Sequence, residues 1–420
     1  MLAVLRQRNF VLLWLSGLVS LTGDRAMRIA LPVYVYQQTG STLATAGMAA
    51  TYYLPAVVLG SVAGVFADRW DRRQIMIATN LIQATVMLLL LLVRSNGWLW
   101  LVYVVSLVDT SVATFFQPAE SAIVPNLVDE EHLIPANSLG SLNNTIARIA
   151  GPPIGGTLIG LFGIGSVAIF NGASFLIAAG LVALILAPSR SAPAASEVAE
   201  VVVSSWVRVW REWRAGLTFV RRDRLVVSLF IVLSVTSFGG AMIDPLFSPF
   251  VLSVLGRGPA TIGWILTTFS IGGLLAGFLV GWFGSKVRPR QLVSFGTILT
   301  GMLMVAMYNQ KSLAPVVVLG FLMYLPVVAA GVGADTMLQT GIPDAFRGRV
   351  YGALSTTNGL LCLGSVGVSG VLSQYVGIVP MLTTAGCVTV LAGTLALVLI
   401  PRAERRDDSA HRDQAAVAHG

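Results

Sequence analysis

The sequence predicts an all-α integral membrane protein with twelve transmembrane helices in two pseudo-symmetric six-helix bundles. Three observations support this fold class. First, 55% of the 420 residues are hydrophobic and 11% are charged, and the mean hydropathy is +0.80, a balance that soluble globular domains do not have. Second, apolar stretches of about 20 residues, the length that crosses a bilayer, recur along the chain. Third, the second half of the chain weakly repeats the first.

The predicted spans are apolar segments separated by short polar or charged ones. Glycine and proline are frequent inside them, as is typical of membrane helices whose neighbours satisfy freed backbone groups. The spans lie at 10–36, 43–66, 73–93, 98–118, 137–161, 165–187, 224–252, 260–283, 291–308, 313–337, 348–374 and 378–400.

The basic residues predict the orientation in the membrane. Of 27 Lys and Arg residues, 21 flank the span ends on the side of both chain termini, whereas Arg94, Arg257 and Lys311 flank the other ends. The positive-inside rule therefore places both termini in the cytoplasm of a multi-pass protein of the cell membrane. This asymmetry, with contact to anionic membrane lipids, accounts for the net charge of +8, so no nucleic-acid partner is expected.

Enzyme chemistry is not predicted. His132, His411 and His419 lie outside the spans, and no nucleophile, base and orienting group gather in the pattern. A P-loop that could bind nucleotide phosphates does not occur in the sequence. Cys362 and Cys387 lie inside spans, which indicates neither a disulfide framework nor a metal site. We therefore expect no catalytic residues, no metal and no cofactor.

Four segments are predicted along the chain. They are an N-terminal six-helix bundle at 1–187, a cytoplasmic linker at 188–223, a C-terminal six-helix bundle at 224–400 and a disordered cytoplasmic tail at 401–420. A shift of 217 positions places Gly64 on Gly281, Pro32 on Pro249 and Arg73-Gln74 on Arg290-Gln291. Such a repeat is typical of two bundles related by an axis along the membrane normal.

The linker is expected to contain an amphipathic helix. Trp206, Trp210 and Trp213 lie on one helical face, and Arg208 and Arg211 occupy others. This pattern predicts a helix in the cytoplasmic interface, with indoles at headgroup depth and guanidinium groups on anionic lipid. A substrate-binding aromatic box is the alternative interpretation.

A dense charged turn joins the second and third spans, with the sequence Gly64-Val65-Phe66-Ala67-Asp68-Arg69-Trp70-Asp71-Arg72-Arg73. It closely resembles the signature between the second and third helices of the major facilitator superfamily. Asp71 stands where most members have glycine, and this form is similar to the macrolide and siderophore exporter branch. We expect a conformational latch formed by Gly64, Asp68, Arg69, Arg72 and Arg73, in which Asp68 meets the N-terminal dipole of span eleven.

Span five carries a second signature, Arg148-Ile149-Ala150-Gly151-Pro152-Pro153-Ile154-Gly155-Gly156. It resembles the Gly-Pro-x-x-Gly-Gly element of the antiporting, exporting members, and through Gly151, Pro152, Gly155 and Gly156 this resemblance favours export over uptake. Small residues permit close helix approach and prolines bend a helix. The alternative interpretation is that these small residues serve only helix packing, which would produce the same sequence.

Ionisable residues inside the spans mark candidate sites, because charges in a bilayer are costly. Asp24 and Arg28 are four residues apart on one helix and can pair. Asp109 and Arg148 lie at similar depth in consecutive spans, and their predicted ion pair needs no role beyond structure. The set comprises Asp24, Arg25, Arg28, Asp109, Arg148 and Asp244.

Asp24 and Asp244 are the candidates for proton coupling. Separating Asp24 from Arg28 in a conformational change would let its carboxylate bind a proton. The repeat places Asp244 opposite Met27, so the two carboxylates could face one central cavity. The flanking Pro245 and Pro249 leave a second interpretation open, in which Asp244 satisfies the backbone of a helix break.

The resemblance and the intramembrane charges together predict a secondary active transporter. We expect proton-coupled efflux of hydrophobic or amphipathic small molecules, such as drugs and antibiotics, by alternating access. The alternatives are a dedicated siderophore or lipid transporter, or a non-transporting membrane sensor or assembly factor on the same fold. The expected partners are a small-molecule substrate, protons and membrane lipids, and the protein is expected to be a monomer. Polar candidates for the cavity are Gln83, Asn143, Asn144 and Asn358.

Overall fold

The structure, a computed structural model, describes residues 3–93, 96–186 and 223–401, with a few residues between 211 and 221. Within these ranges it is helical and contains no strand. The first half holds α1 (Arg8–Thr39), α2 (Thr42–Arg69), α3 (Arg72–Leu88), α4 (Leu99–Ile123), α5 (Leu133–Phe162) and α6 (Ile164–Ala183). The second holds α8 (Arg224–Ala241), α9 (Phe247–Pro249), α10 (Pro259–Phe283), α11 (Pro289–Tyr308), α12 (Leu313–Gly341), α13 (Asp344–Val376) and α14 (Ile378–Leu399).

Short turns extend or connect these helices. They are 3-10 turns at Val4–Arg6, Leu89–Leu92, Asn96–Trp98, Val124–Asn126, Glu130–His132 and Gly284–Lys286, and a π-helical turn at Phe250–Val254.

The predicted number of spans agrees with the long helices. Eleven helices in the described ranges are long and apolar enough to cross a membrane. The twelfth, α5, has 30 residues but carries Asn137, Asn143, Asn144 and Arg148 and is less apolar. It packs against α1 and α10, and the faces of a membrane helix that contact protein can carry polar residues more readily than a face that contacts lipid. The predicted all-α membrane fold is thus confirmed.

The seventh predicted span, 224–252, is interrupted. Helix α8 ends at Ala241, and after a turn the chain continues through α9 into the π-helical turn. Pro245 and Pro249 explain the interruption, because a proline ring lacks the N–H that a helix needs and clashes with the preceding turn. Asp244 therefore lies in a helix break and not on a regular helix.

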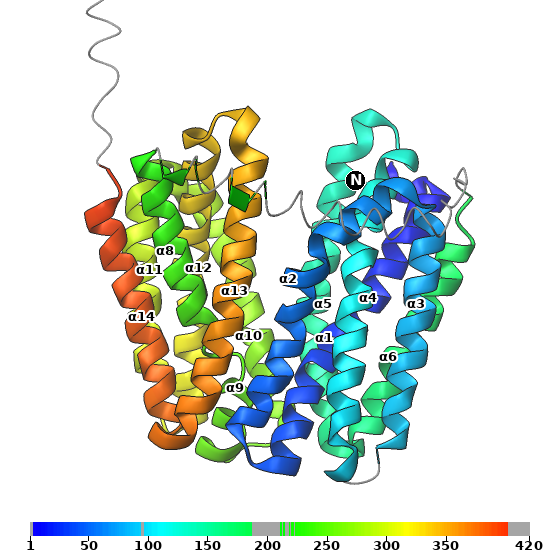
Figure 1. Ribbon diagram of the computed structural model, residues 1–420, viewed down its shortest axis with the longest axis horizontal. Coiled ribbons are helices and arrows are strands. Elements are labelled where there is room, and N and C mark those ends of the chain that lie inside the picture. The colour runs from blue at the N-terminus through cyan, green and yellow to red at the C-terminus, as the bar shows by residue number, and fades with distance from the viewer. Residues whose placement is uncertain are drawn as a thin grey trace, which may run out of the picture.

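The helices form two groups, α1 to α6 and α8 to α14, as Figure 1 shows. The internal repeat is visible in equivalent contacts. Arg73 at the start of α3 donates from Nη2 to the Ala183 carbonyl at the end of α6, at 2.6 Å. Its counterpart Arg290 at the start of α11 donates to the Leu397 carbonyl near the end of α14. One arginine thus anchors the same helix pair in each half.

Among the described residues, the two halves contact each other from the middle of the helices to one end of the molecule. We call the end that holds the Arg69–Arg73 turn the hairpin end, and the end that holds the turn between α1 and α2 the opposite end. Figure 1 shows α2 and α13 close together at the opposite end, below, and apart at the hairpin end, above. At the opposite end, the Ser373 hydroxyl of α13 donates to Thr42 Oγ1 of α2 at 2.8 Å, and the Gln374 side chain donates to the Ser41 hydroxyl at 3.3 Å.

Candidate transport cavity

A cavity of about 430 Å³ lies between the halves. Its charged lining residues are Arg25 and Arg28 of α1, Arg148 of α5 and Asp244 of the break after α8. Aromatic rings from both halves complete the wall, among them Tyr52, Phe247, Phe269, Tyr308 and Tyr324. Three guanidinium groups and one carboxylate therefore face one partly apolar space.

Asp244 is bonded across the boundary between the halves. The Tyr53 hydroxyl of α2 donates to Asp244 Oδ2. Asp244 thus lines the cavity and its carboxylate engages a side chain of the other half. This geometry favours the cavity interpretation of Asp244 over the interpretation in which its side chain only satisfies the broken helix.

The predicted pair between Asp24 and Arg28 is not formed in this structure. The Arg28 guanidinium instead lies over the Tyr52 ring, 5.0 Å from its centroid. Among the described residues, no carboxylate lies within 4.0 Å of Arg25, Arg28 or Arg148. Spacing of four residues puts two side chains on one helical face, but it does not prevent a long arginine from turning to an aromatic ring on a neighbouring helix.

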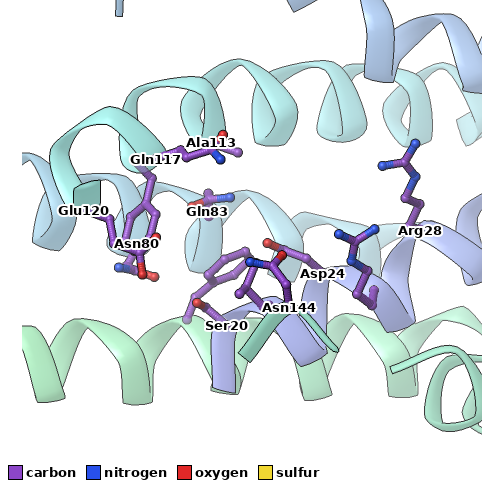
Figure 2. Close-up of a pocket in the computed structure, with 13 residues that line it drawn as sticks. Ser20, Asp24, Arg28, Asn80, Gln83, Ala113, Gln117, Glu120 and Asn144 are labelled. Atoms are coloured by element: carbon purple, nitrogen blue, oxygen red, sulfur yellow. The ribbon is translucent and has the colours of Figure 1, made fainter. Parts of the chain in front are cut away.

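Asp24 lies in a second cavity, of about 330 Å³, inside the first half. Arg25 and Arg28 line both cavities, so the two spaces adjoin. Asp24 Oδ1 is buried without a hydrogen-bond partner. Figure 2 shows Asp24 between Arg28 on one side and Glu120, Asn80 and Gln117 on the other.

Asp109 is held by Gln83 and not by Arg148. Gln83 Nε2 of α3 donates to Asp109 Oδ1 of α4 at 2.9 Å, whereas Arg148 lines the cavity between the halves. The predicted ion pair of Asp109 with Arg148 is therefore absent from this conformation. Similar depth in consecutive helices did not bring them together, because α4 packs on α2 and α3 while α5 packs on α1 and α10.

The other predicted polar residues divide between cavity and packing. Asn144 lines the second cavity and also a third one of about 310 Å³, and Asn143 lines the third. Asn143 Nδ2 donates to the Trp14 carbonyl at 2.7 Å. Asn358 accepts a hydrogen bond from the Ser234 hydroxyl at 3.3 Å, a contact between α13 and α8 that lies apart from the three cavities.

The second signature, in α5, lies where three helices meet. A Cβ atom at Gly155 would lie 2.2 Å from the Ala26 carbonyl oxygen of α1, and one at Gly156 would lie 2.6 Å from the carbonyl oxygen of Pro259, the first residue of α10. The backbones approach too closely for any side chain. Gly151 and Gly155 thus face α1, and Gly156 faces the other half.

The prolines of this signature free two carbonyl groups, and the other half satisfies them. Pro152 and Pro153 have no N–H to donate four residues back, to Arg148 and Ile149. The Ile149 carbonyl accepts from the Thr267 hydroxyl of α10 at 2.7 Å. The Arg148 carbonyl lies 3.3 Å from the Ser270 hydroxyl, which shares its proton with the Leu266 carbonyl of its own helix at 2.9 Å. The signature therefore contributes specific hydrogen bonds between the halves as well as close packing.

The hairpin signature is described in part. The Asp71 side chain caps α3 by accepting from the Gln74 N–H at 3.0 Å. Arg72 Nη1 donates to the Ala122 carbonyl of α4 at 2.5 Å, and Arg73 bonds α6 as noted above. Gly64, Asp68 and Arg69 lie on the last turns of α2, and their side chains are outside the described part of the chain.

The predicted interfacial helix and the tail fall mostly outside the described residues. Trp206, Trp210 and Arg208 belong to that part, as do residues 402–420. Trp213 is described, and its Nε1 donates to Thr357 Oγ1 of α13 at 3.3 Å.

Two residues of the site were not singled out from the sequence. Glu120 lines both the second and the third cavity. The predicted fourth span ended at 118, whereas α4 continues to Ile123, so Glu120 was placed outside the membrane helices. Tyr53 gave no signal in sequence, because its role depends on a contact with Asp244, 191 residues away.

Comparison with known proteins shows the family. The family model described as transmembrane secretion effector, MFS_3, matches residues 1–418. The chain belongs to this family of the major facilitator superfamily. The resemblance noted in the hairpin is thereby confirmed, and so is the expectation of a transporter in place of an enzyme.

Its relatives include bacterial efflux proteins. It is 26% identical over 95% of both chains to the MFS-type transporter YfiS of Bacillus subtilis. It is 24% identical to macrolide efflux protein A of Streptococcus pyogenes, over 88% of this chain and 90% of that one. It is 27% identical to the multidrug efflux pump Tap of Mycolicibacterium fortuitum, over 94% and 97%.

Solved structures show the same fold. A bacterial homologue of the iron transporter ferroportin superposes with a TM-score of 0.71 at 14% identity, over 94% of this chain and 99% of that one. The nucleoside transporter NupG superposes with a TM-score of 0.72 at 13% identity, over 94% of this chain and 100% of that one. At this identity the likeness concerns the fold alone.

Proposed function

We propose that this transporter exports hydrophobic or amphipathic small molecules in exchange for protons, by alternating access. The observation that carries the proposal is the pair of carboxylates Asp24 and Asp244 in adjoining cavities, with Asp24 inside the first half and Asp244 between the halves. Intramembrane carboxylates that face a cavity can take up and release protons. The macrolide and multidrug efflux relatives support the direction and the substrate class.

The orientation follows from the basic residues. If the hairpin end faces the cytoplasm, as the positive-inside rule predicts, the halves are closed toward the outside and separated toward the cytoplasm in this structure. This is the state that receives substrate from inside the cell. The start of α1 and the end of α14 then face the cytoplasm, at the upper end in Figure 1.

Asp244 links proton binding to the conformation. In the outward-closed arrangement its carboxylate accepts the Tyr53 hydroxyl of the other half. Opening the halves toward the outside would separate Asp244 from Tyr53, and the freed carboxylate would then bind a proton from outside. Return to the inward-facing state brings the donor back and favours proton release. Asp24, whose Oδ1 has no partner, takes the second proton-binding role in the first half.

Accumulation measurements test this function. Cells that express the protein and control cells are loaded with ethidium or with labelled erythromycin, with and without a protonophore. The proposal predicts lower accumulation in expressing cells, and loss of this difference when the protonophore is added. Equal accumulation in expressing and control cells for both compounds would contradict efflux of this substrate class. A difference that persists with the protonophore would contradict proton coupling.

A further inference from the structure

The cleft formed by the second and third cavities contains hydrogen-bond acceptors that lack donors. The two cavities share Leu21, Gln117, Glu120 and Asn144, so they form one cleft inside the first half, lined by α1, α3, α4, α5 and α6. Glu120 lies half-buried in it, and no hydrogen bond or ion pair joins its carboxylate to any residue of the described ranges. A carboxylate held in a membrane protein without a partner is costly.

Two buried asparagines add acceptors to the same cleft. Asn80 is 1% exposed and Asn143 is 3% exposed. Their amide nitrogens donate to the carbonyls of Met76 and Trp14, both at 2.7 Å. These bonds fix the orientation of each amide, and both Oδ1 atoms are left without a donor.

The basic groups lie at the other end of the cleft. Figure 2 shows Glu120 and Asn80 at one end and Arg28 at the other, with Asp24 between them. The region around Glu120 is therefore rich in oxygen acceptors and distant from the Arg28 guanidinium. Phe116 and Phe175 also line this cavity, and their rings offer an apolar and π-rich wall.

We propose that Glu120 of α4, with Asn80 of α3 and Asn143 of α5, binds the cationic ammonium group of an amphipathic amine in this cleft. An ammonium group supplies both the positive charge that Glu120 lacks and the N–H donors that the two amide oxygens lack. The inference rests on the proposed function and names the substrate class for it. Protons and the amine would compete for the carboxylates of this cleft, which is the arrangement that exchange of one for the other requires.

Dansylcadaverine, a fluorescent amphipathic primary amine, and its neutral N-acetyl derivative provide a matched pair of probes. Their dissociation constants are measured by fluorescence titration of the purified full-length protein in lipid nanodiscs at neutral pH. The proposal predicts that the dissociation constant of the amine is lower than that of the acetylated compound by about tenfold or more, as expected for a charge-assisted hydrogen bond. Equal affinities would overturn it.

Three variants assign the site. Glu120→Gln keeps the size of the side chain, and it should weaken amine binding by about tenfold to a hundredfold while leaving the acetylated compound unaffected. Asn80→Leu should weaken amine binding in the same direction. Glu131→Gln removes the same charge from a side chain that is 81% exposed outside the cleft, and it should bind both probes as the wild type does.

The outcomes separate this inference from the proposed function. Unchanged amine binding in Glu120→Gln would overturn the site even if efflux remains proton-dependent, and Glu120 would then serve proton movement or packing. Conversely, Glu120→Gln could abolish selective amine binding while wild-type efflux does not respond to a protonophore. This result would support the site and overturn proton coupling.

Discussion

Single residues in this protein act through partners that spacing along the chain does not reveal. Asp24, Asp109 and Asp244 could be singled out from the sequence, because charged residues in apolar segments are conspicuous. The hydrogen-bond partners of these acids could not be identified from the sequence. Asp109 is bonded by Gln83 and Asp244 by Tyr53, both neutral groups from other helices. Neutral polar residues are common in sequence, so only the packing of helices shows which of them meets a carboxylate.

Replacing Gln83 should reduce stability more than replacing Arg148. Gln83→Leu leaves Asp109 without its donor, and an unsatisfied buried group costs about 1–3 kcal/mol. The free energy of unfolding in detergent, or the midpoint of thermal unfolding, measures this change. Adding Asp109→Leu to Gln83→Leu should recover much of the loss, since the orphaned acceptor is then gone.

Arg148→Ala serves as the comparison for this pair. Arg148 has no carboxylate partner within 4.0 Å among the described residues, so its removal should leave stability largely unchanged. A larger loss in Arg148→Ala than in Gln83→Leu would show that Asp109 depends on the arginine after all.

Tyr53→Phe should weaken the closure of the halves at the opposite end. The substitution removes the hydroxyl that donates to Asp244 and keeps the ring. We expect an increased population of the outward-open state. The rate at which a membrane-impermeant maleimide labels a cysteine introduced at Gln374, next to Ser41 across the boundary, should rise in this variant. An unchanged labelling rate would show that Tyr53 does not hold the halves together.

At the scale of helices, α5 determines how the halves meet. Its glycines allow contact with α1 and α10, and its prolines free the carbonyls that Thr267 and Ser270 satisfy. The sequence predicted close packing for this segment from its small residues. The hydroxyl partners could not be predicted, because Thr267 is 118 residues away and nothing in the local pattern of α10 marks it.

Thr267→Val therefore tests the role of the freed carbonyls. Valine is similar in shape but cannot donate, so the Ile149 carbonyl loses its partner in the outward-closed state. We expect a shift toward the outward-open state and a lower rate of efflux, with normal expression. Thr268→Val is a matched control, because the Thr268 hydroxyl donates within its own helix, to Trp264. Equal effects of the two variants would contradict a specific role for Thr267.

The hairpin between α2 and α3 is expected to act as a latch in the opposite conformation. Asp68→Asn should lower transport without unfolding the protein, because the N-terminal dipole of α13 would lose its negative partner when the hairpin end closes. Efflux rate and thermal unfolding are the measurements. Wild-type transport in this variant would remove the latch role.

At the scale of the whole molecule, the sequence was sufficient to predict the all-α membrane fold. Apolar length, the basic asymmetry and the internal repeat predicted twelve membrane helices in two halves, and the described part of the chain contains twelve long helices. The break after Ala241 was suggested only by Pro245 and Pro249, and the fourth helix was predicted too short to include Glu120. Hydropathy cannot detect such polar turns at helix ends, because polar residues that face a cavity resemble those of a loop.

The central claim is that outward transport is driven by protons that bind Asp24 and Asp244. It is tested most directly by proton flux in proteoliposomes that contain the purified protein, a pH-sensitive dye and an acidic lumen. Adding ethidium outside should trigger proton release from the lumen in the wild type, and no such release in the Asp24→Asn, Asp244→Asn double variant that has the same thermal stability. Ethidium uptake without proton release in the wild type, or undiminished release in the double variant, would contradict the account.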